Sequence, residues 1–155
     1  GGSCANGIES TIIGFENDAP IIYRLGALPI EDIEAVVGKL VVKNNKEENL
    51  DAPGMLARHY APKTSTFLVT DVLSEVKKHA GKKIGILVFK SSLNYENITE
   101  VVLSKEGSMQ EAASKLYAAM HALDHKNLDI IIAERFPDFG LGNSINDRLQ
   151  RATFK

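Results

Sequence analysis

Residues 84–89 read Ile-Gly-Ile-Leu-Val-Phe, and residues 128–133 read Leu-Asp-Ile-Ile-Ile-Ala; these two stretches decide the fold. Each is short, compact and almost entirely apolar, which is typical of a strand buried on both faces of a parallel sheet. Between them, Ser108 and Glu111 have the spacing of a capping box, at the start of a helix that we expect to reach about His125. A buried strand, a long helix and a second buried strand predict a parallel α/β unit.

The same pattern continues on both sides of this unit. Residues 66–70 are expected to form a strand, followed by a helix that Asp71 caps. A weaker strand is expected at 98–103, and a final helix begins at Asn143 or Ser144. Strands that alternate with helices predict a small Rossmann-like sheet, parallel or mixed, with flanking helices and right-handed crossovers.

The N-terminal part of the chain predicts a smaller unit. Two strands are expected at 10–15 and 21–24, joined by a turn-rich segment. A short helix is expected at 30–37, with Gly38 as its C-terminal cap. Two strands and one short helix bury too little apolar surface to be stable alone, so this unit must lean on another part of the protein.

A shift in composition separates the two parts. Residues 43–49 read Lys-Asn-Asn-Lys-Glu-Glu-Asn and contain no apolar side chain that could enter a core. Such a run is typical of a linker or an exposed loop. We therefore expect an incomplete N-terminal unit at 1–40, a linker at 41–63 and a C-terminal α/β domain at 64–155.

Composition restricts the classes of function. The 155 residues are 44% hydrophobic and 25% charged, as in an ordinary globular protein, and the net charge of -2 argues against a strongly cationic nucleic-acid surface. The single cysteine, Cys4, excludes an internal disulfide framework and fits a reducing, cytoplasmic compartment. No apolar run approaches the length of a membrane span, so no membrane partner is expected. Because the chain begins with Gly1 and not with Met, we expect it to be processed, trimmed or tagged.

Two motifs that could carry chemistry have simpler explanations. His121 and His125 lie four residues apart on a helix, but no third ligand accompanies them, so no metal site is expected. Residues 140–142, Gly-Leu-Gly, could present backbone N–H groups to an anion. However, Ile145 stands where a dinucleotide-binding fingerprint has glycine, and a turn that begins the last helix is the better interpretation.

Other polar groups remain open on the residues alone. Residues 146–148, Asn-Asp-Arg, with Arg151 could be a polar site or a salt-bridged helix face, and their spacing favours the second. Ser10 is by default a buried hydroxyl or a strand-edge hydrogen bond. Arg24 ends an apolar strand, where a guanidinium is costly unless a carboxylate or phosphate pairs with it. Residues 58–60, Arg-His-Tyr, lie between prolines and could equally grip a ligand or pack the linker on a domain.

Several motifs together resemble one known family. Gly-Ile-Glu-Ser-Thr at 7–11 and Tyr-Arg-Leu-Gly at 23–26 resemble the tail of the YrdC-like catalytic domain. The segment at 53–62, with Pro-Gly-Met and Arg-His-Tyr-Ala-Pro, resembles the interdomain linker of the long, two-domain form of L-threonylcarbamoyladenylate synthase. Gly-Leu-Gly at 140–142 and Ile-Asn-Asp-Arg-Leu at 145–149 resemble the end of that enzyme's C-terminal α/β domain. The resemblance covers essentially the whole chain.

This resemblance implies a nucleotidyltransferase. The family converts threonine, bicarbonate and ATP to threonylcarbamoyl-AMP and pyrophosphate, for modification of the adenosine beside the tRNA anticodon, and Mg²⁺ would arrive with the ATP. It implies that Ser10 helps to bind threonine, that Arg24 and Tyr60 bind ATP, and that Arg58 and His59 join Tyr60 in a lid. It assigns no catalytic residue and no protein metal ligand here. Other tRNA-modification proteins are expected partners, whereas the net charge argues against direct tRNA binding.

The chain also departs from the family pattern. Leu25 stands where the family usually has proline, and the family's upstream nucleotide-binding motifs are absent, so we expect a C-terminal fragment that is inactive alone. Two alternatives stay open. The chain could be a freestanding α/β module that binds a small ligand or regulates another protein. It could also be an RNA-contacting module, although the net charge and the lack of clustered aromatic residues count against this.

Overall fold

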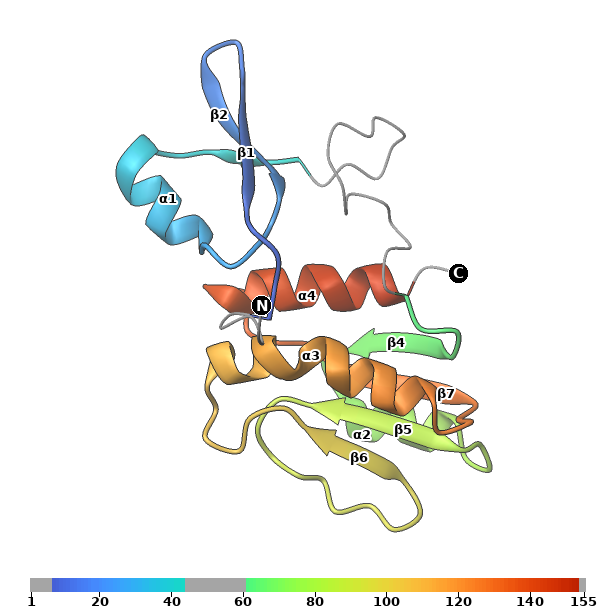
Figure 1. Ribbon diagram of the computed structural model, residues 1–155. Helices are drawn as coiled ribbons and strands as arrows, with labels where there is room; N and C mark the ends of the chain where they lie inside the picture. The colour runs from blue at the N-terminus through green and yellow to red at the C-terminus, as the bar shows by residue number, and fades with distance from the viewer. Residues whose placement is uncertain (1–6, 44–60, 154–155) are drawn as a thin grey trace, which may run out of the picture.

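The computed structural model describes residues 7–43 and 61–153, which form two units with separate sheets (Figure 1). The larger unit contains a four-stranded sheet in the order β4-β7-β5-β6, and all of its pairs are parallel. Its strands are β4 (Ser65–Val69), β5 (Ile84–Val88), β6 (Thr99–Val102) and β7 (Ile130–Glu134). Since β5 and β7 pair directly, the two stretches that decide the fold lie side by side at the centre of the sheet. The expected α/β class is therefore confirmed.

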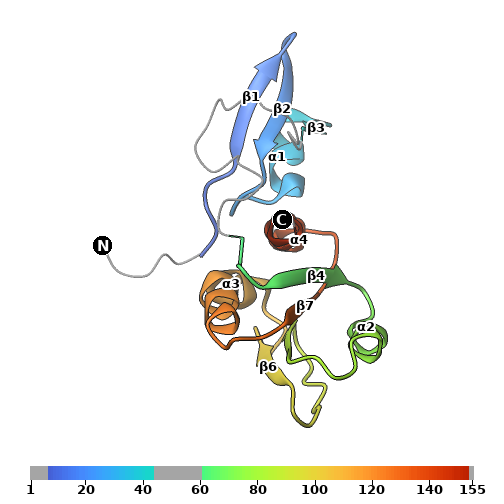
Figure 2. The ribbon, with the colours of Figure 1, turned by 90° about the vertical axis from the view of Figure 1, so that its right-hand side faces the viewer.

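Helices cover both faces of this sheet (Figure 2). They are α2 (Val72–Lys78), α3 (Met109–Asp124) and α4 (Leu141–Ala152). Side chains of β7 alternate between the faces: Ile130 and Ile132 join the core cluster that contains Val72 and Val76 of α2, and Ile131 joins the larger cluster of α3 and α4. This alternation explains why the strand is apolar from Ile130 to Ala133, as the sequence indicated.

The N-terminal unit is a hairpin with one helix beside it. Its elements are β1 (Ile12–Glu16), β2 (Ala19–Arg24), α1 (Ile30–Val37) and β3 (Val41–Val42). The hairpin closes through Asn17 and Asp18, whose φ angles of 48° and 61° lie in the left-handed region that these residue types tolerate. The short strand β3, which pairs in parallel with β2, was not expected, because its two residues were assigned to the start of the linker.

Most helix ends follow the sequence signals, with one difference in detail. Asp71 caps α2 by accepting a hydrogen bond from the Ser74 N–H at 3.0 Å, and Ser108 caps α3 through the Glu111 N–H at 3.2 Å. The reciprocal half of the expected capping box is wrong. The Ser108 N–H donates to the Ser104 hydroxyl at 2.8 Å, while the Glu111 carboxylate contacts Ser104 and Lys115 instead.

The last helix was expected to begin at Asn143 or Ser144 and begins two or three residues earlier, at Leu141. Gly140 precedes it with a φ of 54°, a conformation that favours glycine. The helix can start at this point because Gly142 lacks a side chain: a Cβ there would lie 2.0 Å from the Pro137 carbonyl oxygen. Gly140 therefore lies in the turn expected at the start of the helix, whereas Gly142 belongs to the helix itself.

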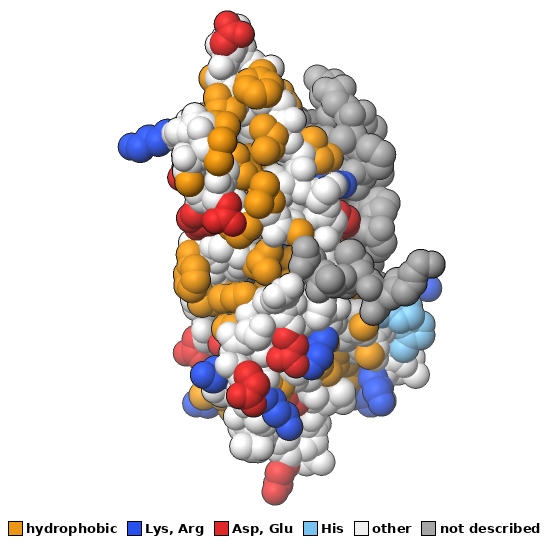
Figure 3. Space-filling model, turned by 60° about the vertical axis from the view of Figure 1, so that its left-hand side comes forward, with side chains coloured by type: hydrophobic (Ala, Val, Ile, Leu, Met, Phe, Trp, Pro, Cys, Tyr) orange, Lys and Arg blue, Asp and Glu red, His pale blue; other side chains and the backbone are white. Residues whose placement is uncertain are grey.

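Large hydrophobic side chains are exposed on the N-terminal unit. Figure 3 shows hydrophobic atoms gathered over this part of the surface. The exposed side chains of the unit are Ile13, Phe15, Leu28, Val36, Val37 and Val41, and Val36 reaches 85% exposure. So large an exposed apolar surface is typical of a face that another segment or molecule covers.

Within 7–43 and 61–153, none of the helices combines the length and apolar character needed to cross a membrane.

Candidate functional site

Ser10 and Arg24, both expected at a substrate site, lie in direct contact. The Arg24 Nη2 atom donates to the Ser10 hydroxyl at 3.2 Å and to the Ser10 carbonyl oxygen at 3.0 Å, and its Nε atom donates to the same carbonyl at 3.1 Å. The pairing of β1 with β2 brings them together, since Arg24 ends β2 opposite Ile12, two residues after Ser10. A hydroxyl and a guanidinium thus share one location at the base of the hairpin.

Two chain segments cross at this base with almost no space between them. The Ala27 N–H donates to the Glu9 carbonyl oxygen at 2.9 Å. Gly26 lies at the crossing, where a Cβ atom would be only 2.2 Å from the Thr11 nitrogen and 2.3 Å from the Ser10 carbonyl carbon. Glycine is therefore required because the two backbones approach each other, and the crossing fixes the position of Ser10 relative to Arg24.

Helix α4 of the larger unit grips both segments through Arg148. The Arg148 Nη2 atom donates to the Leu25 carbonyl oxygen at 2.8 Å, and its Nε atom donates to the Glu9 carboxylate at 3.0 Å. The remaining nitrogen, Nη1, pairs with the Asp147 carboxylate at 2.5 Å. Only 5% of the Arg148 side chain is exposed, and Arg148 is the one charged residue that is buried within the described parts of the chain. One guanidinium therefore connects three chain positions.

The charges around Arg148 reinforce one another. Burial is the largest single influence and raises the pKa of the Glu9 carboxyl, but the charge of Arg148 and the hydrogen bonds from Arg148, the backbone and Tyr117 together outweigh it, and the pKa lies below its ordinary value of 4.5. The Tyr117 hydroxyl lies 3.2 Å from both Glu9 carboxylate oxygens, and burial together with Glu9 raises the pKa of Tyr117 to about 12. Burial opposes the charge on Arg148, yet Glu9, Tyr117 and Asp147 hold its pKa above the ordinary value. At neutral pH the Glu9 carboxylate and the Arg148 guanidinium are therefore both charged, and the Tyr117 hydroxyl donates a hydrogen bond to Glu9.

Further contacts extend this junction between the two units. The Ser144 hydroxyl of α4 donates to the Gly26 carbonyl oxygen at 2.7 Å. Ile8 is buried in the core cluster of the larger unit, together with Leu116 and Leu149. The Gly140 N–H, at the start of α4, donates to the Glu31 carboxylate of α1 at 3.2 Å. The helix end considered as an anion site thus meets a carboxylate of the protein itself.

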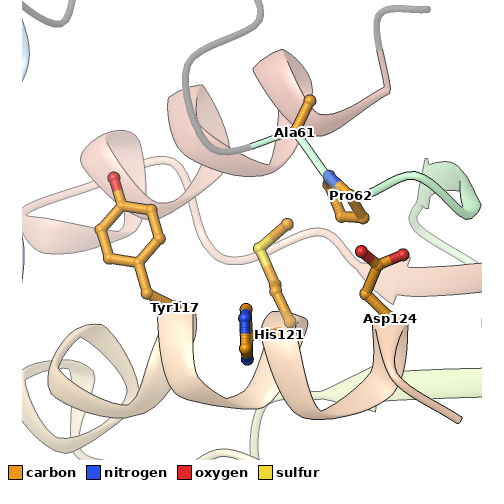
Figure 4. A pocket seen from close by; sticks show the side chains of 6 residues that line it. Ala61, Pro62, Tyr117, His121 and Asp124 are labelled. Atoms are coloured by element: carbon orange, nitrogen blue, oxygen red, sulfur yellow. The ribbon is translucent and has the colours of Figure 1, made fainter.

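A cavity of about 230 Å³ lies beside the junction, over α3 (Figure 4). Tyr117, His121 and Asp124 line it from the helix, and Ala61 and Pro62 line it from the opposite side. The Asp124 carboxylate holds the chain next to Pro62 by accepting from the Thr64 N–H and hydroxyl, both at 2.8 Å. Arg58, His59 and Tyr60, expected to form the lid, lie outside the described residues.

The described residues do not assemble a metal-binding cluster. Residues 7–43 and 61–153 contain no group of three or more histidine, cysteine, aspartate or glutamate side chains able to hold an ion. The rings of His121 and His125 lie 4.1 Å apart between centroids, and the Nδ1 atom of His125 is 2.8 Å from the His121 carbonyl oxygen. The contact with the carbonyl oxygen thus occupies the Nδ1 atom of His125.

Comparison with known proteins adds to this geometry. Residues 28–153 match the family described as threonylcarbamoyl-AMP synthase, C-terminal domain. The match covers most of the chain, including all of the parallel sheet and α4. The chain belongs to this family. The long-form synthase that the sequence motifs resemble is therefore also the family that the comparison identifies.

Individual members of the threonylcarbamoyl-AMP synthase family align with nearly all of the chain. The enzyme of Pyrococcus abyssi is 31% identical, and the alignment covers 99% of this chain and 48% of the relative. The enzyme of Bacillus subtilis is 31% identical, with 98% and 47% covered. A crystal structure of P. abyssi Sua5 complexed with L-threonine superposes with a TM-score of 0.81 at 30% identity, covering 99% of this chain and 48% of that one. The chain thus spans about half the length of the curated relatives it matches.

Sequence reasoning missed the role of Arg148 in this synthase-family domain. The favoured interpretation, a salt-bridged helix face, describes Asp147 and Arg151, whose carboxylate and Nε atoms lie 3.0 Å apart. Arg148 instead faces the N-terminal unit. The signal that could have revealed it is its spacing: Arg148 is three residues from Ile145 and one from Leu149, so it lies on the apolar stripe of α4. A charged residue on a buried stripe requires a partner.

Proposed function

We propose that these 155 residues are the C-terminal part of a threonylcarbamoyl-AMP synthase. The N-terminal unit of these residues places Ser10 and Arg24 where the substrates bind. The observation that carries the proposal is the contact between the Ser10 hydroxyl and Arg24, 3.2 Å apart, at the base of the hairpin. The family match and the P. abyssi structure complexed with L-threonine support it. The complete polypeptide would form threonylcarbamoyl-AMP from threonine, bicarbonate and ATP for tRNA modification, in the cytoplasm.

The chemistry suits these two side chains. The threonine amine and bicarbonate form an N-carboxylate (carbamate) with loss of water. A carbamate oxygen then attacks the α-phosphorus of ATP while the bond to the β-phosphate breaks and pyrophosphate leaves. Catalysis of such a transfer rests on positioning and on cations that offset the developing negative charge. Arg24 offers a planar set of donors for phosphate, and the Ser10 hydroxyl suits the carboxylate or hydroxyl of threonine.

The proposal assigns further roles more broadly. Tyr60 would contact ATP from the linker, with Arg58 and His59 completing a lid. Mg²⁺ would be held mainly by the nucleotide's phosphate oxygens, and no residue of this chain is assigned to it, because the described carboxylates form no metal-binding group. Other tRNA-modification proteins would be partners, and the net charge of -2 argues against direct binding of tRNA.

The test is pyrophosphate release by the complete native polypeptide that contains these residues, supplied with L-threonine, bicarbonate and ATP. We expect release that depends on all three substrates. Ser10→Ala should raise the KM for L-threonine, and Arg24→Ala should lower turnover and weaken ATP binding. Release that continues unchanged when threonine is omitted would contradict the proposal.

A second candidate function rests on a different observation. A cavity of about 210 Å³ lies at the carboxyl ends of β4, β5 and β7, lined by Thr70, Asp71, Ser91 and Glu134 among others. Crevices at this edge of a parallel sheet commonly bind small ligands, which favours a small-ligand-binding or regulatory role for the larger unit. A thermal-shift screen with amino acids and nucleosides tests it, and stabilisation that Glu134→Gln abolishes would support it. No stabilisation by any of them would count against it.

A further inference from the structure

The contacts of Arg148 meet the candidate substrate residues at two adjacent positions. Arg148 pairs with Glu9, the residue directly before Ser10, and it binds the carbonyl of Leu25, the residue directly after Arg24. Arg148 therefore holds the chain at the residue directly before Ser10 and at the residue directly after Arg24. Arg148 itself does not belong to the hairpin but to α4, 139 residues after Glu9.

We propose that Arg148 is a positioning residue, through which the C-terminal domain holds Ser10 and Arg24 in the geometry that receives the substrates. The inference rests on the proposed function of Ser10 and Arg24. It also gives the larger unit a role: α4 is a rigid support for a site that lies on the other unit.

The surroundings of Arg148 make such a support stiff. Its neighbour Asn146 is 5% exposed and holds the loop before α4, donating to the Phe136 carbonyl and accepting from the Phe136 N–H, both at 2.8 Å. Ile145 and Leu149 are fully buried in the core on either side. Helix α4 is therefore held in place by the core of its own domain. The hairpin adapts to the position of the Arg148 guanidinium, and the helix does not shift to follow the hairpin.

The guanidinium shape is what the geometry uses. Arg148 meets a carboxylate, a backbone carbonyl and a second carboxylate with three different nitrogens. A lysine ammonium is a compact charge on a flexible chain and does not reproduce this planar set of donors. Arg148→Lys should therefore keep much of the charge interaction with Glu9 but lose the simultaneous grip on Leu25. Arg148→Met should lose both and leave Glu9 without its cation.

The kinetic test uses the complete native polypeptide with Arg148→Lys, Arg148→Met and, as a control, Ile132→Val. Ile132 is buried in the cluster on the opposite face of the sheet, so its truncation weakens the fold without touching the junction. We expect Arg148→Met to lower kcat/KM for L-threonine on the order of 10- to 100-fold, since misplacing the substrate by about 1 Å has effects of this size on rate. Arg148→Lys should restore part of the loss. Assays well below each variant's melting temperature separate this from unfolding. An Arg148→Met kcat/KM equal to that of Ile132→Val would overturn the inference.

A second readout does not need activity. Hydrogen exchange of the Ala27 amide, which is bonded to the Glu9 carbonyl, reports on the crossing of the two segments. Arg148→Met should speed this exchange at least tenfold while amides of β5 and β7 exchange as in the wild type. Equal exchange in both proteins would overturn the inference. If the wild-type polypeptide releases no pyrophosphate, the proposed function fails, and this exchange measurement then decides the role of Arg148 alone.

Discussion

Replacing Gly26 with alanine tests the close crossing that fixes Ser10 and Arg24. The added Cβ would lie 2.2 to 2.4 Å from backbone atoms of Glu9, Ser10 and Thr11, and real Cβ contacts are essentially never shorter than 3.0 Å. Backbone atoms cannot rotate away as a flexible side chain can. The two segments must therefore separate by about 0.8 Å even to reach that limit.

The free-energy cost follows from the contacts that this separation disturbs. The Ala27 N–H bond to Glu9 joins the two segments and is 2.9 Å long, while α4 binds the second segment through the Ser144 hydroxyl at 2.7 Å and the Arg148 guanidinium at 2.8 Å. Because Arg148 also holds Glu9, such a shift stretches these bonds to the limit of hydrogen-bonding distance or past it. Loss of about 1 kcal/mol for each of two or three bonds, with about 1 to 3 kcal/mol for overpacking, lowers the free energy of unfolding by about 3 to 6 kcal/mol.

Chemical denaturation of the chain with Gly26→Ala measures this cost, and Gly38→Ala is the matched control. Gly38 has a φ of 81° and a ψ of -170°, but no atom lies within 4 Å of an added Cβ, so alanine there costs only the backbone strain, about 1 to 3 kcal/mol. A Gly26→Ala protein that unfolds at the same denaturant concentration as Gly38→Ala would refute the crossing described here.

Three further predictions concern pH, association and the linker. Because the folded-state pKa of Glu9 lies below 4.5, the Glu9–Arg148 pair stabilises the fold above that pH and the stabilisation is lost as pH falls; Glu9→Gln should flatten the acid side of a stability–pH curve. The exposed hydrophobic side chains of the N-terminal unit should drive the isolated chain to self-associate, and light scattering that finds a strict monomer at every concentration would contradict this. In the complete polypeptide, Tyr60→Ala or Arg58→Ala should weaken calorimetric ATP affinity with an unchanged melting curve, whereas unchanged affinity would reduce the linker to a tether.

Local signals in the sequence were sufficient for most of the fold. Strands β5 and β7 were predicted because continuous apolar runs of this length suit a buried parallel strand. The Asp71 cap and the end of α1 at Gly38 were predicted because each depends on residues within one turn of helix. Such features need no knowledge of distant parts of the chain.

Features that depend on distant residues could not be predicted in this way. Val41 and Val42 form a strand only because β2 offers them an edge, and the two residues alone carry too short a pattern. Arg148 has its partner Glu9 139 positions away, so its helix neighbours could suggest only an ordinary ion pair. Ser10 and Arg24 were named through a family resemblance, and the structure adds that they are in contact.

Formation of threonylcarbamoyl-AMP, measured by mass spectrometry, tests the central claim most directly. The claim is that these residues contribute to the substrate site of a synthase and that they do not form the whole of that site. The complete native polypeptide and the isolated 155-residue chain are each supplied with L-threonine, bicarbonate and ATP. We predict product from the complete polypeptide, a large loss of product with Arg148→Met, and none above a protein-free blank from the isolated chain. Product from the isolated chain, or none from the complete polypeptide, would contradict the claim.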